Sequence, residues 1–575
     1  MGPGSPLRSG ALILGVALAA GLALRGATLR LDPPSYVRYG VAWGDEGGWT
    51  WPAVYRINQG DWPVTGAPYV AVAPVYFGAQ ALVLSVLGAG LEQARVLSLV
   101  CGLGMVLLLS VMAGWVGGVP AAALAGGMYA TLYWAIIFER YAAPEALGVL
   151  FLSLAFFLVH ARRSSWLTLL VASACAVSAF ASKITLVFGF PLIVGLWLLN
   201  RRNDRRLLPA TTVGRAAFVG GVTALVACYV FVFLQALSPS LPIVAEKVAA
   251  SRSWSHAVSG VLMRWAIAPL QGDLLLTMPV VWGGLVLAGL RGVPASPVAV
   301  RILTGAGLWL LAWWMVVPIH DLKGSRYYLI FVPMVLIGVL GWLGTLRRSW
   351  HPGTAKARWL RRTGLWLRGA TAVWFALTLA VALSTLGFAR ARNALFVTLP
   401  LAAVAFVTIR SGRRPMAASG PAPLAGAVIL VAINLVAEAP RFDAWIRHNP
   451  GLGVRAVAAA APVLPMDGVI CSSVSPLLLV GSRGGLQAAH DFYWPDCVVE
   501  GTPADWIVIP EDLECPLFDW PDIRPAQARL LAQTPLLRVM LPGEPSVGRP
   551  AACAYRIVPL PFALGDRDSH PTRDP

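Results

Sequence analysis

The sequence predicts a polytopic α-helical membrane protein with about 13 transmembrane helices, followed by a small extracytoplasmic α/β domain at the C-terminus. Composition is the first reason. Of the 575 residues, 57% are hydrophobic and 13% are charged, and the mean hydropathy is +0.69. Such a composition excludes a soluble globular chain. The apolar runs are the second reason, because they are continuous over about 20 residues and therefore predict helices rather than the strands of a barrel.

Charge placement is the third reason. The formal net charge is +18, but the basic residues form short clusters between the apolar runs, so they indicate membrane orientation rather than nucleic-acid binding. We expect all of these clusters on the cytoplasmic side: Arg162–Arg163, Arg201–Arg206, Arg291–Arg301, Arg347–Arg368 and Arg410–Arg414.

The first span is predicted at Gly10–Leu29, with a cytoplasmic N-terminus and a long external segment over residues 32–93. A cleaved signal peptide is the alternative for this span. The external segment contains the apolar run Tyr69–Leu91, which Pro74 and Gly78 interrupt, and we interpret it as re-entrant or interfacial. If that run crosses the membrane instead, the orientation of everything after it inverts.

The later spans follow at intervals that keep every basic cluster on one side. Their predicted bounds are Arg95–Val116, Pro120–Phe138, Pro144–Ala161, Trp166–Ser182, Ile184–Asn200, Val213–Ala236, Leu274–Leu290, Ile302–Pro318, Tyr327–Leu346, Leu367–Phe388, Ala394–Ile409 and Leu424–Ala437. This pattern places the C-terminus outside. Residues 1–438 are thus predicted to form the transmembrane module, 439–565 a soluble extracytoplasmic domain, and 566–575 a disordered tail.

The C-terminal region contains short apolar runs typical of strands, separated in places by helical stretches, which predicts the α/β domain. The predicted strands are Gly468–Cys471, Leu477–Val480, Trp506–Ile509, Leu536–Met540 and Ala554–Val558. Four cysteines fall in this domain: Cys471, Cys497, Cys515 and Cys553. In an oxidising space they permit two disulfides with three alternative pairings, and reduced thiols are the other reading.

Three predicted external loops gather the residues able to do chemistry. The first contains Trp43-Gly44-Asp45-Glu46-Gly47-Gly48-Trp49, the second runs from Glu139 to Glu145, and the third from His320 to Tyr328. Acidic residues are rare in this chain, 27 in all, so carboxylates at one membrane face are informative. Carboxylates act as general bases or hold a divalent cation, and Arg or Lys binds phosphate.

These loops resemble, in order, the motifs of the GT-C glycosyltransferases, in particular the branch of protein O-mannosyltransferases and lipid A aminoarabinose transferases. The matching segments are Gly44-Asp45-Glu46, Asn58-Gln59-Gly60-Asp61-Trp62, Phe138 to Glu145, Ala181-Ser182-Lys183-Ile184-Thr185, and Ser325-Arg326-Tyr327-Tyr328 with Pro333. The resemblance covers about residues 1–440. One departure is Thr65-Gly66-Ala67-Pro68, where many relatives carry a charged residue before the proline.

The resemblance implies an inverting transfer of a sugar from a polyprenyl-phosphate donor to an acceptor hydroxyl at the extracytoplasmic face. It implies Asp45 as general base, Glu46 as its partner and Glu145 as the second carboxylate. For the donor phosphate it implies Arg326 and Tyr327, with Arg140 and Lys183 behind them. The sequence fixes no cofactor, and a divalent cation would take Asp45, Glu145 and His320 as ligands.

Each residue also has a structural alternative. Asp45 and Glu46 can be a solvated loop pair, and His320 can be an ordinary loop histidine. Glu145 can have a purely structural role at a helix N-terminus, where the helix dipole favours a carboxylate. Arg140 and Lys183 can extend to the headgroups, with Glu139 as another partner for Arg140, and Arg326 with Tyr327 can anchor the chain at the interface.

The expected partners are the lipid-linked donor, the bilayer and an acceptor that is a lipid, a glycan or a protein, with no nucleic acid. The expected location is the bacterial inner (cytoplasmic) membrane, with the active site and the C-terminal domain outside. A transporter or flippase for a lipid-linked or small solute is the competing function, although charged residues sit at span ends and no internal duplication is evident.

Overall fold

The computed structural model describes residues 5–29, 49–50, 53, 73–88, 90–160, 165–200, 211–250 and 297–316, parts of 329–338 and 427–443, and four strands between 470 and 556. The chain divides into two compact units, Met1–Gly88 with Glu92–Pro450, and Ala89–Leu91 with Gly451–Pro575. The predicted domain boundary at 438/439 stays a prediction.

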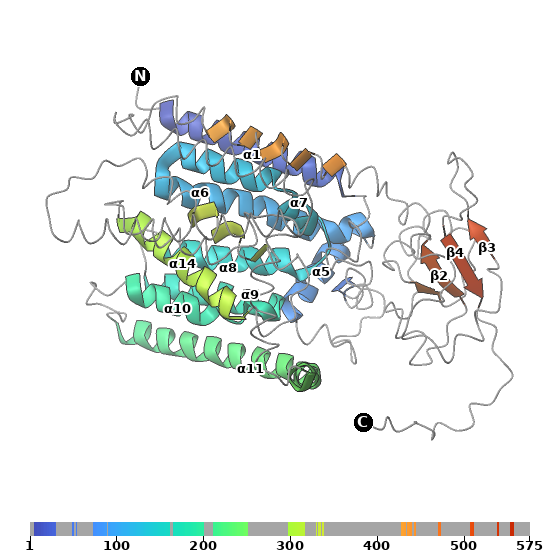
Figure 1. Cartoon of the computed structure of the whole chain (residues 1–575). Coiled ribbons are helices and arrows are strands. Elements are labelled where there is room, and N and C mark those ends of the chain that lie inside the picture. The colour runs from blue at the N-terminus through green and yellow to red at the C-terminus, as the bar shows by residue number, and fades with distance from the viewer. Residues whose placement is uncertain are drawn as a thin grey trace. The chain divides into compact units, whose positions relative to one another are not determined.

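The first unit is helical (Figure 1). Its elements are α1 (Ser5–Ala27), α5 (Pro74–Leu87), α6 (Leu91–Thr131), α7 (Tyr133–Glu139), α8 (Pro144–His160), α9 (Trp166–Ser182), the short 3₁₀ helix η1 (Ile184–Leu186), α10 (Gly189–Asn200), α11 (Thr212–Ala250) and α14 (Pro297–Val316). Their bounds follow most of the predicted spans up to residue 236. The predicted spans at 274–290, 367–388 and 394–409 lie outside the described residues.

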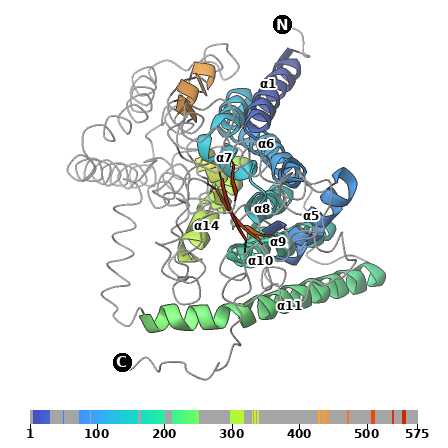
Figure 2. The same ribbon diagram turned by 90° about the vertical axis from the view of Figure 1, so that its right-hand side faces the viewer.

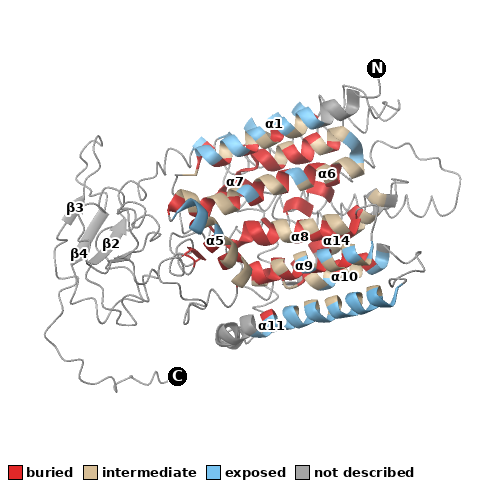
Figure 3. Ribbon diagram, turned by 180° about the vertical axis from the view of Figure 1, so that it is seen from behind, coloured by how far each residue is buried: buried red, intermediate tan, exposed pale blue. Residues whose placement is uncertain are grey.

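Among the described residues, α6 and the first part of α11 (Thr212–Leu234) are long and apolar enough to cross a membrane. A third candidate arises if α7 and α8 are taken as one bent span. In Figure 3 most of α11 is coloured as exposed, and its exposed residues include Val213, Val226 and Phe231, as expected for a helix that faces lipid. The protein is therefore an integral membrane protein, whereas the predicted count of helices stays a prediction.

α6 is a helical hairpin rather than one straight helix. Gly118 has a φ of 75° and Pro120 follows it, so the backbone breaks there. A Cβ built on Gly126 would lie 2.1 Å from Ser110 Oγ, and one on Gly114 would lie 3.6 Å from Ala122 Cβ. Because these contacts join residues at equal distances from the break, the two arms are antiparallel, as predicted from the separate spans.

Two helices depart from the predicted bounds. Gly78 does not interrupt the run after residue 69, because α5 begins at Pro74, a favoured first position, and continues through Gly78 to Leu87. At 14 residues α5 is about 21 Å long, shorter than the hydrocarbon core. α11 continues past Ala236 to Ala250, through Pro239 and Pro242. Figure 1 shows the last turns of α11 end-on, so the helix changes direction after its first part, and prolines are a common cause of such a bend.

The core of this unit lies between α6, α7, α8, α9 and α14, where aromatic and aliphatic side chains are fully buried. Figure 2 shows α8, α9 and α10 close together in a second view. Segment 427–443 packs against the end of α6, where Asn434 donates to Thr131 Oγ1 at 3.1 Å and Phe442 meets Tyr133 edge to face. The late part of the helical unit is thus tied to the early part.

The second unit contains a four-stranded mixed sheet in the order β1-β2-β4-β3. The strands are β1 (Ile470–Ser472), β2 (Trp506–Pro510), β3 (Leu537–Val539) and β4 (Ala552–Arg556). β1 and β2 are parallel, and the other two pairs are antiparallel. Four of the five predicted strands are found within about two residues of their predicted positions. The predicted strand 477–480 and the helices of this domain lie outside the described residues.

The sheet register restricts the disulfide alternatives. Cys471 is paired with Ile507, which is paired in turn with Tyr555. Cys471 and Tyr555 are therefore two strand spacings apart, about 10 Å, and Cys553 lies two residues further along β4. Since a disulfide needs Cα atoms within about 7 Å, Cys471 and Cys553 cannot be bridged in this sheet. Of the three pairings, those that join Cys471 to Cys497 or to Cys515 stay predictions, with reduced thiols as the other reading, and Cys497 and Cys515 lie outside the described residues.

Candidate active site

Glu145 and Lys183 meet at one end of the α8–α9 pair. Both helices have 17 residues and a short connection joins them, so the start of α8 and the end of α9 lie at the same end. Lys183 Nζ is 2.8 Å from Glu145 Oε1, and both side chains are buried. Two residues that are 38 positions apart in the sequence thus form an ion pair away from water.

Local sequence explains both positions. Glu145 follows Pro144 in the first turn of α8, where a carboxylate is favoured by the helix dipole. Lys183 is the C-cap of α9, and its backbone N–H donates to Ala179 O at 3.0 Å. A Cβ on Gly148 would lie 2.6 Å from Leu186 Cδ1 and 3.5 Å from Lys183 Cβ. Glycine at 148 therefore lets the two helix ends approach closely enough for the ion pair.

Trp49 covers the lysine of this pair. Lys183 Nζ lies 4.7 Å from the centroid of the Trp49 ring, within the range of a cation–π contact. Trp49 is itself fixed by α5, because it stacks on Phe77 at 6.0 Å and meets Tyr76 edge to face at 6.5 Å. The end of the first acidic motif is thereby held against Lys183, the cation of the ion pair.

A sharp corner joins α7 to α8. The two helices are bent by 110° across residues 140–143, and all four of these residues are buried. Arg140 is the C-cap of α7 and its N–H donates to Ile136 O, while the N–H of Ala143 donates to Tyr141 O at 2.8 Å. The corner has Glu139 at its entry and Glu145 near its exit.

The predicted site residues are only partly described. Glu145, Arg140 and Lys183 are buried in the first unit, and the structure brings Glu145 and Lys183 together. The residues Asp45, Glu46, His320, Arg326 and Tyr327 lie outside the described residues. Within the described part of the chain, no group of three His, Cys, Asp or Glu side chains is placed to hold a metal ion. The roles assigned to all of these residues stay predictions.

Sequence reasoning gave no role to Trp49, Arg25 or Tyr129, which the structure places in buried polar contacts. A signal for Arg25 was present, because it is an arginine inside the apolar first span, and such residues are rare without a partner. Trp49 closes the glycine-rich acidic motif, but no pattern linked it to Lys183. Its packing depends on α5, which is distant from Lys183 in sequence.

Comparison with known proteins gives structural neighbours only. No family model and no curated protein matches the chain. Over 95% of its length it is similar to ArnT from Cupriavidus metallidurans, at 16% identity and over 97% of that chain. The TM-score is 0.47 for the apo state and 0.48 for the form bound to undecaprenyl phosphate.

A second neighbour is the archaeal oligosaccharyltransferase AglB from Archaeoglobus fulgidus in complex with an inhibitory peptide and a dolichol-phosphate. It is 10% identical, with a TM-score of 0.39, over 88% of this chain and 70% of that chain. Both neighbours have TM-scores below 0.5, so the likeness carries no argument about the family or the activity of this chain. At these identities and TM-scores no residue role is carried across, so the chemistry is derived from this chain's own residues.

Proposed function

We propose that this protein transfers a sugar from a polyprenyl-phosphate donor to an acceptor hydroxyl at the extracytoplasmic face of the membrane, with inversion at the anomeric carbon. One observation carries the proposal: the buried Glu145–Lys183 pair lies against Trp49, the last residue of the acidic glycine-rich motif. Charged side chains inside a membrane protein are costly, and the contact with the acidic motif is what singles out this pair as part of the reaction site.

Chain connectivity supports the grouping of the predicted catalytic residues. Consecutive Cα atoms are about 3.8 Å apart, so the four peptide links from Asp45 to Trp49 span at most about 15 Å. The three links from Arg326 to Leu329 span at most about 11 Å. Leu329 is buried, and the next residue, Ile330, accepts a hydrogen bond from Trp309 at 3.1 Å.

Trp309 connects this late segment to the region after Lys183. It packs edge to face on Phe188, five residues beyond Lys183, and on Phe156 of α8. The predicted phosphate ligand Arg326 is therefore tethered to the same helical core as the ion pair.

In the proposed reaction the acceptor oxygen attacks the anomeric carbon and the bond from that carbon to the phosphate oxygen breaks. The acceptor proton passes to Asp45, which Glu46 orients, and the polyprenyl phosphate leaves with the bonding electrons. Arg326, with Tyr327 and Arg140, stabilises the charge on the leaving phosphate. Glu145, neutralised by Lys183, orients the acceptor or sugar hydroxyls. The same proposal places the protein in the bacterial inner membrane.

The test is donor consumption by purified protein in liposomes, with undecaprenyl-phosphate-linked pentose and hexose as probes. Wild type releases undecaprenyl phosphate and transfers the sugar, whereas Asp45→Asn, purified in equal yield, loses about 10²- to 10⁴-fold in rate. Movement of the lipid or of a small solute across the bilayer that Asp45→Asn leaves unchanged, without transfer by wild type, would establish the competing transport function.

A further inference from the structure

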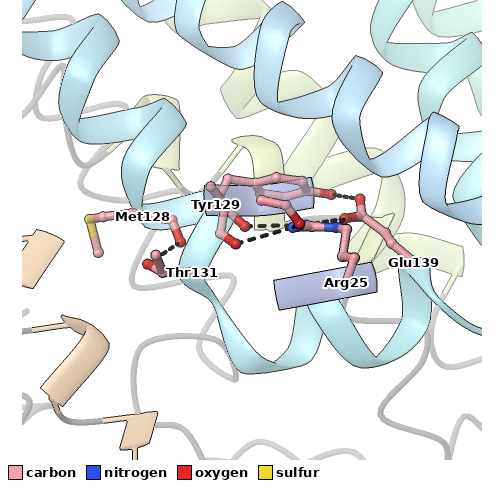
Figure 4. Close-up of polar contacts among 7 residues, drawn as sticks. Arg25, Met128, Tyr129, Thr131 and Glu139 are labelled. Carbon is pink, nitrogen blue, oxygen red and sulfur yellow. Dashed lines mark hydrogen bonds and ion pairs between the residues drawn. The ribbon is translucent and has the colours of Figure 1, made fainter. Parts of the chain in front are cut away.

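A second buried charge cluster lies at the other end of the α7–α8 corner (Figure 4). Arg25 of α1 is fully buried and pairs with Glu139 of α7, with Arg25 Nε donating to Glu139 Oε2 at 3.0 Å and Nη2 contacting the same oxygen. The hydroxyl of Tyr129 in α6 donates to Glu139 Oε1 at 2.6 Å. Both carboxylate oxygens of Glu139 are therefore engaged, each from a different helix.

Arg25 also binds the end of α6. Its Nη1 donates to Ala130 O at 3.1 Å and its Nη2 lies 3.4 Å from Tyr129 O. The last carbonyls of a helix lack partners within the helix and carry partial negative charge, so a guanidinium is well suited to cap them. Arg25 thus holds the C-terminal end of α6 next to Glu139.

The backbone after Glu139 leads directly to the candidate site. Residues 140–143 are buried, and Ser98 Oγ donates to Ala143 O at 3.4 Å. Only five residues separate Glu139 from Glu145. Because a buried, close-packed segment transmits displacement, a shift of Glu139 is passed along the corner to Glu145.

Gly102 of α6 makes room for this cluster. A Cβ built on Gly102 would lie 2.5 Å from Glu139 Oε2 and 2.9 Å from Arg25 Nε. Substituting alanine must therefore move the ion pair, although it removes no polar group. This gives a way to displace Glu139 without leaving a buried charge alone.

We propose that Arg25, Tyr129 and Glu139 are positioning residues that set the α7–α8 corner so that Glu145 is aimed at the reacting sugar. The inference rests on the proposed glycosyl transfer and extends it to residues that contact no substrate. The alternative, that the cluster only holds three helices together, predicts a loss of folded protein with full activity in whatever remains folded.

The decisive pair of variants is Gly102→Ala and Gly305→Ala. A Cβ on Gly305 of α14 would lie 2.8 Å from Phe156 Cε2 and 3.0 Å from His160 Cε1, so it overpacks the far end of α8 to a similar degree. His160 is 15 residues from Glu145, about 22 Å along the helix. Gly305→Ala is therefore a matched packing control away from the corner.

On purified, monodisperse protein we expect Gly102→Ala to lower kcat by about 10- to 100-fold with KM for the donor almost unchanged. Gly305→Ala should lower the melting temperature similarly but lower kcat less, because Phe156 and Trp309 lie between its clash and the segment that carries Arg326. If Gly102→Ala does not fold, Tyr129→Phe removes one hydrogen bond to Glu139 and should lower kcat about fivefold. Wild-type kcat in whichever of the two variants folds would overturn the inference.

Amide hydrogen exchange at residues 140–143 and at Glu145 separates this inference from the proposed function. Exchange there should be faster in Gly102→Ala, or in Tyr129→Phe if only that variant folds, than in wild type and Gly305→Ala, whatever substrate the protein uses. Absence of sugar transfer by wild type would refute the proposed function alone. Unchanged exchange at the corner would refute the positioning role alone.

Discussion

The described part of the chain contains two buried ion pairs, Arg25–Glu139 and Glu145–Lys183, at the two ends of one helix corner. Arg25 is surrounded by backbone carbonyls of α1 and α6 and by the Tyr129–Glu139 hydrogen bond. Lys183 instead lies against an aromatic ring from the predicted catalytic loop. Burial and charge alone therefore do not assign a role to an ion pair. The role follows from the residues that surround it.

The largest expected effect is on activity at Glu145. Glu145→Gln keeps the shape of the side chain but removes the charge that we assign to substrate orientation. We expect a loss of about 10²- to 10⁴-fold in kcat/KM on monodisperse protein. Glu139→Gln is the matched variant at the other pair and should lose less activity per folded molecule. A larger loss at Glu139 than at Glu145 would reverse the roles assigned here.

The next effect is on stability. Arg25→Met leaves Glu139 buried without its ion-pair partner and uncaps α6, which we expect to cost about 3–5 kcal/mol. Thermal unfolding in detergent measures the stability of Arg25→Met and of Lys183→Met. We expect Lys183→Met to be the less destabilised of the two. The double variant Arg25→Met/Glu139→Leu should recover much of the loss, because an apolar pair has no charge to desolvate. Additive losses would contradict a direct pairing.

A smaller effect tests the contact of the first loop with Lys183. Trp49→Leu removes the ring over the ammonium group, a contact of about 1 kcal/mol, and loosens the loop that carries Asp45. We expect kcat to fall at least about fivefold. Trp49→Phe keeps an aromatic face and should lose less, and equal losses in both variants would mean that packing on α5 matters rather than the cation–π contact.

The smallest effect concerns a divalent cation. Glu145 already has the ammonium of Lys183 at 2.8 Å as its counter-charge. We expect a chelator to change kcat by less than about twofold, against the several kcal/mol that a catalytic cation contributes. Loss of activity on chelation, restored by adding back Mg²⁺ or Mn²⁺, would instead support the ligand set Asp45, Glu145 and His320.

Much of the fold up to residue 236 was predictable. The bounds of α9, Trp166–Ser182, match the prediction at both ends, because Ser165 caps its start and Lys183 leaves helical geometry after it. The meeting of Glu145 with Lys183 could also have been predicted, since two helices of equal length with a short connection bring their distal ends together. The length of α11 could not, because prolines usually end helices.

The sequence by itself determined the membrane class, the apolar helices and the order of the chemistry-bearing motifs, because these depend on composition and on spacing along the chain. The tertiary structure decided which charged side chains form ion pairs with one another. Arg25 and Glu139 are 114 residues apart, and Gly102 makes room for them from another helix. The physical reason is that a charge inside a membrane protein must find a partner in space, and helix packing, which no local pattern encodes, selects that partner.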